Sequence, residues 1–90
     1  MEQTKSILML GRRDPTETMR VAAGLTIFNH TPSIVFLVPV PDTPENAEMA
    51  ELLEFSDVES KTTVENQSLP HIGADALAAA ILAADEVINI

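Results

Sequence analysis

The sequence has no cysteine, and this absence excludes disulfide bonds, thiolate metal sites and any chemistry that needs a cysteine nucleophile or a persulfide. Aromatic residues are also scarce, because the chain has three phenylalanines but no tryptophan and no tyrosine. Hydrophobic residues nevertheless make up 46% of the 90 residues. The chain therefore has enough apolar side chains for one modest core, and that core must be mainly aliphatic.

Positive charge is the second shortage. Five lysines and arginines stand against 14 acidic residues, and the formal net charge is −9. A domain of this charge repels phosphate backbones, so we expect no binding to nucleic acid. The bases are unevenly placed, since four of the five lie within the first twenty residues: Lys5, Arg12, Arg13 and Arg20.

Long hydrophobic runs are missing as well. The N-terminus has neither the basic start nor the extended apolar stretch of a signal peptide. The longest apolar runs fall far short of the ~18–20 residues that cross a bilayer. We therefore expect a cytoplasmic protein that does not enter a membrane.

What the sequence does contain is an alternation of short β-rich runs with longer helical patterns. Single helices between strands predict a three-layer α/β/α domain over residues 1–90, with a four-stranded parallel sheet and right-handed crossovers. The strand order 3-2-1-4 is favoured, because it puts the two most apolar strands in the middle and the polar third strand at an edge. The predicted strands are 6–10, 33–38, 59–64 and 86–90, and the predicted helices are 15–28, 44–55 and 74–84.

Two of the predicted helices begin with a capping residue followed by proline. Asp14 precedes Pro15, and Thr43 precedes Pro44. The side chains of Asp and Thr accept hydrogen bonds from free amides of the first turn, and proline lacks only an N–H that has no partner there. Both helices are therefore predicted to begin at the proline.

Ligands of open parallel sheets bind beyond the carboxyl ends of the strands. That rule selects the loops 11–16, 39–44 and 65–73. The first loop carries Arg12, Arg13 and Thr16 at the start of a helix, a combination that suits a carboxylate, a phosphate or a sulfur oxyanion. The alternative is that the two arginines pair with acidic residues of this chain or of a neighbour.

Two histidines complete the set of candidate residues. His71, in the third loop, is a candidate for binding an anion or moving a proton, whereas His30 ends the first helix, where an imidazole is a favourable residue. No His, Asp or Glu has the spacing of a zinc site, and no Ser or Thr has a general base at a recognisable spacing. We therefore predict no catalytic residue, no metal and no cofactor.

Seven acidic residues and no base lie between Asp42 and Glu59. They form either a docking surface for a basic partner or a solvated helix face that keeps the protein soluble. The helices of 15–28 and 74–84 carry more apolar surface than a domain of this size can bury internally. We therefore expect the chain to associate with copies of itself.

Several segments occur in an order that is typical of one family. After an apolar first strand come Asp14-Pro15-Thr16, Ala22-Ala23-Gly24-Leu25, Ile34-Val35-Phe36-Leu37 and finally Ala83-Ala84-Asp85-Glu86-Val87-Ile88. In this layout the chain resembles the DsrE/DsrF-like sulfur-relay family, which includes the Tus sulfurtransferase subunits. The resemblance implies a three-layer parallel α/β fold, assembly into trimers, hexamers or hetero-oligomers with related subunits, and a role in handling sulfur.

The chain departs from this family at the residue that does its chemistry. Active members carry persulfide sulfur on a cysteine at the rim of the sheet, and no position of this sequence offers one. The resemblance therefore implies a non-catalytic structural or partner subunit. Two other functions stay open: a module that binds a small anionic ligand or nucleotide through the Gly11–Thr16 loop and His71, and an enzyme that uses histidine and carboxylate chemistry.

Overall fold

The computed structural model describes residues 6–65 and 67–90 as seven elements around one sheet. They are β1 (Ile7–Gly11), α1 (Pro15–Ile27), β2 (Ser33–Phe36), α2 (Pro44–Phe55), β3 (Ser60–Thr62), α3 (Ala74–Ala83) and β4 (Glu86–Asn89). All four strands are parallel, and their order is β3-β2-β1-β4. The predicted α/β fold and the predicted strand order are both confirmed.

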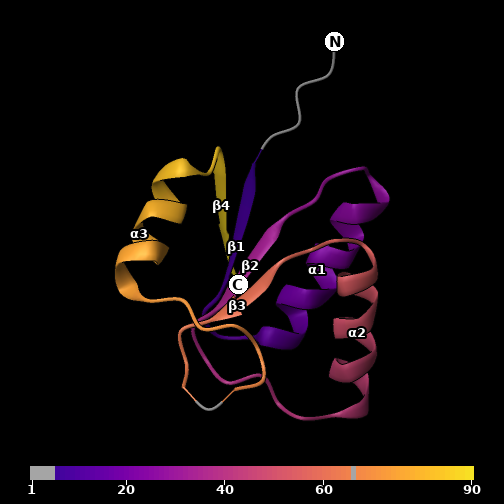
Figure 1. Ribbon diagram of the computed structural model, residues 1–90. Coiled ribbons are helices and arrows are strands. Elements are labelled where there is room, and N and C mark those ends of the chain that lie inside the picture. Colours follow the sequence, from indigo (N-terminus) through magenta and orange to yellow (C-terminus); the bar gives the residue numbers. More distant parts are fainter. Residues whose placement is uncertain (1–5, 66) are drawn as a thin grey trace.

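Three layers result from the direction in which the chain crosses the sheet. The first two crossovers step from β1 to β2 and from β2 to β3, so right-handed connections place α1 and α2 on the same face. The third crossover returns past β1 to β4, and α3 therefore covers the opposite face (Figure 1). No helix of the described residues is long and apolar enough to cross a membrane.

The two faces of the sheet carry cores of unequal size. β1 is buried along its whole length and supplies side chains to both cores. The larger core lies under α1 and α2, and its buried residues are Ile7, Met9, Met19, Ala22, Ile34, Phe36, Leu53 and Val58. The smaller core lies under α3 and has four buried residues: Leu8, Leu10, Val35 and Ile72. Helix α3 contributes only partly buried side chains to it, so much of this helix faces outward.

Both predicted N-terminal caps are present. Asp14 Oδ1 accepts a hydrogen bond of 3.0 Å from the amide of Glu17, and Thr43 Oγ1 accepts one of 3.1 Å from the amide of Asn46. Each cap therefore stabilises a helix that begins at proline, as the sequence indicates. The helix α2 spans the predicted residues, and α1 and α3 each end one residue earlier than predicted.

The C-terminal ends of α1 and α2 share one geometry. Asn29 and Asp57 take the left-handed conformation, with φ of 65° and 62°. The amide of the next residue then donates to a carbonyl five residues back. In α1, His30 donates to Leu25 at 3.1 Å, and in α2, Val58 donates to Leu53 at 2.9 Å. This is the Schellman motif, which satisfies carbonyls that a helix leaves unpaired at its end.

Some large apolar residues of the helices face the solvent. Ile27 is 78% exposed and Leu82 is 87% exposed. Both follow the helical spacing of the apolar residues of their helices, so α1 and α3 each carry an apolar side chain that the sheet does not cover. Spacing groups apolar residues on one side of a helix, but it does not say how far along that side the sheet reaches.

Candidate functional site

The loop after β1 uses two of its backbone amides within the protein. The amides of Arg12 and Arg13 donate to the carbonyl oxygen of Ile90, at 2.8 and 3.0 Å. These amides are therefore not available to the predicted anion. The two guanidinium groups are on exposed residues and form no ion pair within residues 6–65 and 67–90, so an anion at this loop would be bound through side chains.

Arg20 does not extend this positive region. The Arg20 guanidinium binds Glu17, with its Nη2 at 2.6 Å from Oε1. The hydrogen bond and the charge of Glu17 raise the pKa of Arg20. Lys5 lies outside the described residues. Arg12 and Arg13 are thus the two remaining bases of the predicted cluster in the described part of the chain.

Thr16 and His71 do not join the arginines in one cavity. The Thr16 hydroxyl donates to Asn46 Oδ1 at 2.9 Å, so it already serves a contact between α1 and α2. His71 is exposed and its backbone pairs with Thr62 beyond the free edge of β3. Three strand spacings therefore lie between His71 and β1, about 14 Å along the sheet. That Arg12, Arg13, Thr16 and His71 bind one ligand together stays a prediction. The backbone arrangement does not favour it.

Asn46 is not among the predicted site residues, but it lies at the centre of a hydrogen-bond network. Its side chain is buried, accepts from Thr16 and donates through Nδ2 to the carbonyl of Pro41 at 2.9 Å. The backbone amide of Asn46 also donates a hydrogen bond to the hydroxyl of Thr43. One buried side chain thus fixes the loop 37–43 against the N-terminal ends of two helices.

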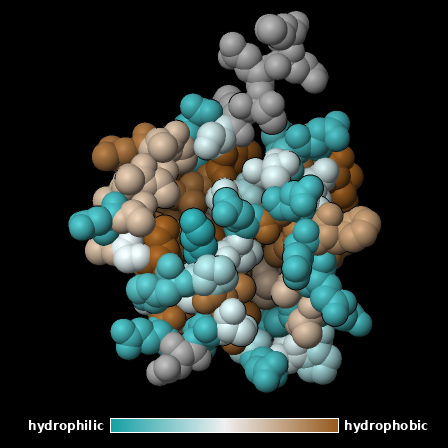
Figure 2. Space-filling model, viewed as in Figure 1, coloured by the Kyte–Doolittle hydropathy of each residue, from teal (hydrophilic) through white to brown (hydrophobic). Residues whose placement is uncertain are grey.

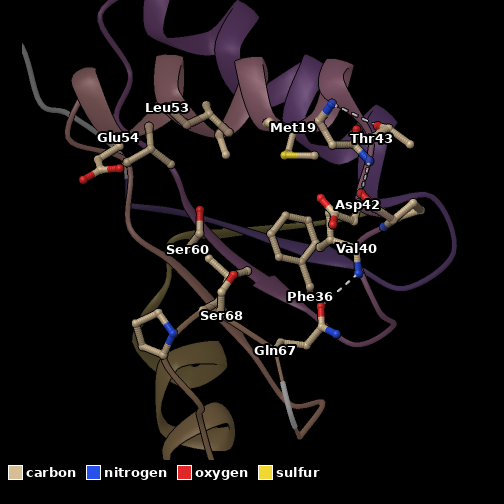
Figure 3. Close-up of a pocket in the computed structure, with 17 residues that line it drawn as sticks. Met19, Phe36, Val40, Asp42, Thr43, Leu53, Glu54, Ser60, Gln67 and Ser68 are labelled. Carbon is tan, nitrogen blue, oxygen red and sulfur yellow. Dashed lines mark hydrogen bonds between the residues drawn. The ribbon is translucent and has the colours of Figure 1, made fainter.

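The loop fixed by Asn46 forms one side of a groove with a volume of about 710 Å³. The groove lies between α2, the ends of β2 and β3, and the loop that follows β3 (Figure 3). Its two loops are joined where Gln67 Oε1 accepts a hydrogen bond of 3.3 Å from the amide of Val40. Among the apolar residues that border it, Val40 and Leu69 are half-buried, whereas Met19, Phe36, Leu53 and Val58 are buried and expose almost no surface to it.

A second feature is a group of apolar side chains at the C-terminal ends of α1 and α2, which we call the helix-end patch. It consists of Ile27, Phe28, Leu52 and Phe55, all of them exposed. The two helices pack against each other and point the same way, so their last turns lie at the same end of the sheet (Figure 1). Hydrophobic atoms also reach the surface over α3, as Figure 2 shows at its upper left.

Comparison with models of protein families, with curated proteins and with solved structures finds no match for this chain. The resemblance to the DsrE/DsrF-like family therefore stays a prediction. In the part of the chain that the structure describes, no three His, Asp or Glu side chains come together as a metal site. The helix-end patch is accordingly the feature from which a function can be argued.

Proposed function

We propose that this chain is a non-enzymatic subunit that assembles with copies of itself or with related α/β chains. The sequence has no cysteine, so the persulfide chemistry of the family that it resembles cannot be its own contribution. What such a subunit can supply is a surface that holds other subunits in place.

The observation that carries this proposal is the exposure of aromatic side chains. The chain has three phenylalanines, and only Phe36 is in the core. Phe28 is 74% exposed and Phe55 is 89% exposed. Phenylalanine is among the residues most often buried, and a side chain of this size contributes strongly to the energy of an interface. Two such residues at one end of the molecule favour a protein–protein contact.

The helix-end patch also has the composition of an interface centre. Ile27 is next to Phe28 at the end of α1, and Leu52 lies in the last turn of α2 with Phe55, so each helix end carries two exposed apolar side chains. Acidic residues of α2, such as Glu48 and Glu51, are exposed on the same helix. An apolar centre with a polar border is the usual anatomy of a contact between subunits.

Native mass spectrometry and sedimentation velocity at micromolar concentration test the proposal. We expect the wild-type chain to form an oligomer, in line with the trimer or hexamer that the resemblance implies. The double variant Phe28→Ser/Phe55→Ser should shift the population to the monomer, because it removes the two largest side chains of the patch. A matched control is Leu82→Ser, since Leu82 is equally exposed but lies on α3.

Two results would contradict the proposal. A wild-type chain that stays monomeric at micromolar concentration would remove its basis. An oligomer that survives the double variant but dissociates in the Leu82→Ser control would place the contact on α3 and show that the helix-end patch is not the interface.

A further inference from the structure

The two edges of the sheet differ in how they are covered. Beyond β3, the backbone of His71 pairs with Thr62, so the chain itself partly occupies that edge. β4 pairs with β1 on one side, and no segment of the described residues pairs with its other side (Figure 1). An open strand edge offers backbone donors and acceptors to another chain. β4 is therefore the edge at which a further strand can join the sheet.

The hydrogen bonds between β4 and β1 decide which groups of β4 face the open edge. The amides of Glu86 and Ile90 donate to carbonyls of the segment 6–10 at 3.1 and 3.0 Å. Backbone groups of a strand point alternately to its two sides, so every second residue of β4 faces β1 in the same way. The amides and carbonyls of Val87 and Asn89 consequently face outward and are available to a partner strand.

These outward groups favour one register for a second, antiparallel copy of β4. In an antiparallel pair, the residues that exchange hydrogen bonds lie directly opposite each other. If Val87 of each copy lies opposite Asn89 of the other, every outward donor and acceptor of the strand is used. A register that places either residue opposite itself uses half of them. The favoured register has a two-fold axis at Ile88, so the contact closes on itself and forms a dimer rather than a filament.

The charges at the two ends of β4 fit this register. Glu86 begins the strand and is exposed. At the other end, the amides of Arg12 and Arg13 donate to the carbonyl of Ile90. Both arginines are exposed and form no ion pair within residues 6–65 and 67–90. The register puts Glu86 opposite Ile90 of the second copy, and opposite charges therefore meet at both ends of the strand pair.

Apolar side chains on both faces of β4 are only half-buried. Ile88 and Ile90 pack against the main core, and Val87 packs against the smaller core on the other face. In the favoured register, Ile88 of one copy lies opposite Ile88 of the other, where side chains of an antiparallel pair come close. Pairing with a second copy therefore covers more of these side chains and extends both cores.

We propose that β4 pairs antiparallel with β4 of a second copy of this chain and so joins two sheets into one. Val87 lies opposite Asn89 of the second copy, and Glu86 lies beside the two arginines of that copy. Each copy contributes one short strand, so the contact is weak and transient, with a Kd on the order of 0.1–1 mM. It is not populated at micromolar concentration and uses a different surface from the helix-end patch, so either contact can fail without the other.

The dimer is measured in the full-length Phe28→Ser/Phe55→Ser variant, which removes the proposed helix-end contact. Sedimentation equilibrium from about 0.05 mM to about 3 mM gives the Kd. In an equal mixture of 13C-labelled and unlabelled chain, we expect an intermolecular NOE between the Hα atoms of Ile88 in the two copies. The amide protons of Val87 and Asn89 should shift as the concentration rises, because they gain hydrogen-bond partners.

One substitution and its matched control locate the contact on β4. Asn89→Pro removes an outward N–H, and its ring occupies the space of the second strand, so it should abolish the dimer. Proline at this exposed position costs no hydrogen bond to β1, because the amide of Asn89 faces the open edge. Asn89→Thr keeps that amide at the same position and should leave the Kd unchanged.

The arrangement of charges is tested by Glu86→Arg. This substitution places like charges beside Arg12 and Arg13 of the second copy and should raise the Kd about two- to tenfold. It also makes the net charge less negative, so a dimer limited only by general repulsion would instead become tighter. Glu48→Arg makes the same charge change at an exposed position of α2 and should not weaken the dimer.

Three results would overturn the proposal: no dimer at about 3 mM, a dimer without the NOE between the Ile88 Hα atoms, or a dimer that persists in Asn89→Pro. A tighter dimer in Glu86→Arg would overturn the pairing of Glu86 with the arginines. Failure of the wild-type chain to form an oligomer at micromolar concentration would contradict the helix-end contact alone.

Discussion

Gly11, the last residue of β1, shows how one missing side chain allows the core to close. A Cβ atom at this position would lie 2.8 Å from Cδ1 of Phe36 and 3.1 Å from the Thr18 hydroxyl. Phe36 and Thr18 are both fully buried, so neither can move aside. The approach of β1 to these two side chains therefore requires glycine.

We predict that Gly11→Ala lowers the free energy of unfolding by about 1–3 kcal/mol, the cost of overpacking a filled core. Gly24→Ala is the matched control, because Gly24 lies in the middle of α1 with open space where its Cβ would be. That substitution should instead stabilise the protein by roughly 0.5–1 kcal/mol through helix propensity. Urea denaturation measures both, and equal midpoints for Gly11→Ala and the wild type would refute the packing argument.

The residues of the candidate sites were only partly predictable. The cap formed by Thr43 followed from local sequence, because its partner lies three residues away. The contact between Thr16 and Asn46 joins residues 30 positions apart and depends on how two helices pack, which no local pattern encodes. For the same reason the sequence could not show that Ile90 occupies the amides of Arg12 and Arg13.

At the scale of elements, the C-terminal end of α2 holds a residue that does not suit its position. Asp57 holds φ of 62°, a conformation that costs a non-glycine residue about 1 kcal/mol. Its negative charge also lies at the negative end of the helix dipole of α2, where acids are unfavourable. The position is therefore occupied by a residue that is unfavourable on two counts.

We predict that Asp57→Gly raises the free energy of unfolding by about 1 kcal/mol, because glycine adopts this conformation without strain. Asp57→Asn separates the two causes, since it removes the charge and keeps the side chain. Thermal or urea unfolding should show a smaller gain for Asn than for Gly. Equal gains would assign the effect to the charge alone, and a loss of stability in Asp57→Gly would contradict the backbone argument.

All seven elements could be predicted, because each relies on local periodicity. The strand order could be predicted because the most apolar strands lie in the middle of the sheet and the polar β3 lies at an edge. The ends of the strands were harder to predict: β2 stops at Phe36 rather than at Val38, and β3 has three residues rather than six. Apolar or β-branched residues continue beyond both strands. A strand ends where its neighbour no longer pairs with it, and that limit belongs to the sheet rather than to the segment.

For the whole molecule, the net charge of −9 opposes the proposed assembly through the helix-end patch. Each subunit of an oligomer adds like charge, and this repulsion acts over the Debye length, about 10 Å at 0.1 M salt and about 3 Å at 1 M. Apolar contacts do not weaken when salt is added. Association through apolar contacts should therefore strengthen when salt is added, whereas association through ion pairs should weaken.

We predict that the proposed oligomer becomes more stable as sodium chloride rises from about 0.1 M to about 1 M, because salt screens the repulsion and would leave apolar contacts of Phe28 and Phe55 intact. Sedimentation velocity across this range gives the dissociation constant at each salt concentration. If Arg12 and Arg13 instead held a neighbouring subunit through its acidic residues, salt would weaken the oligomer, and Arg12→Ala/Arg13→Ala would dissociate it at low salt. The sign of the salt dependence thus separates an interface built on the helix-end patch from one built on the arginine loop.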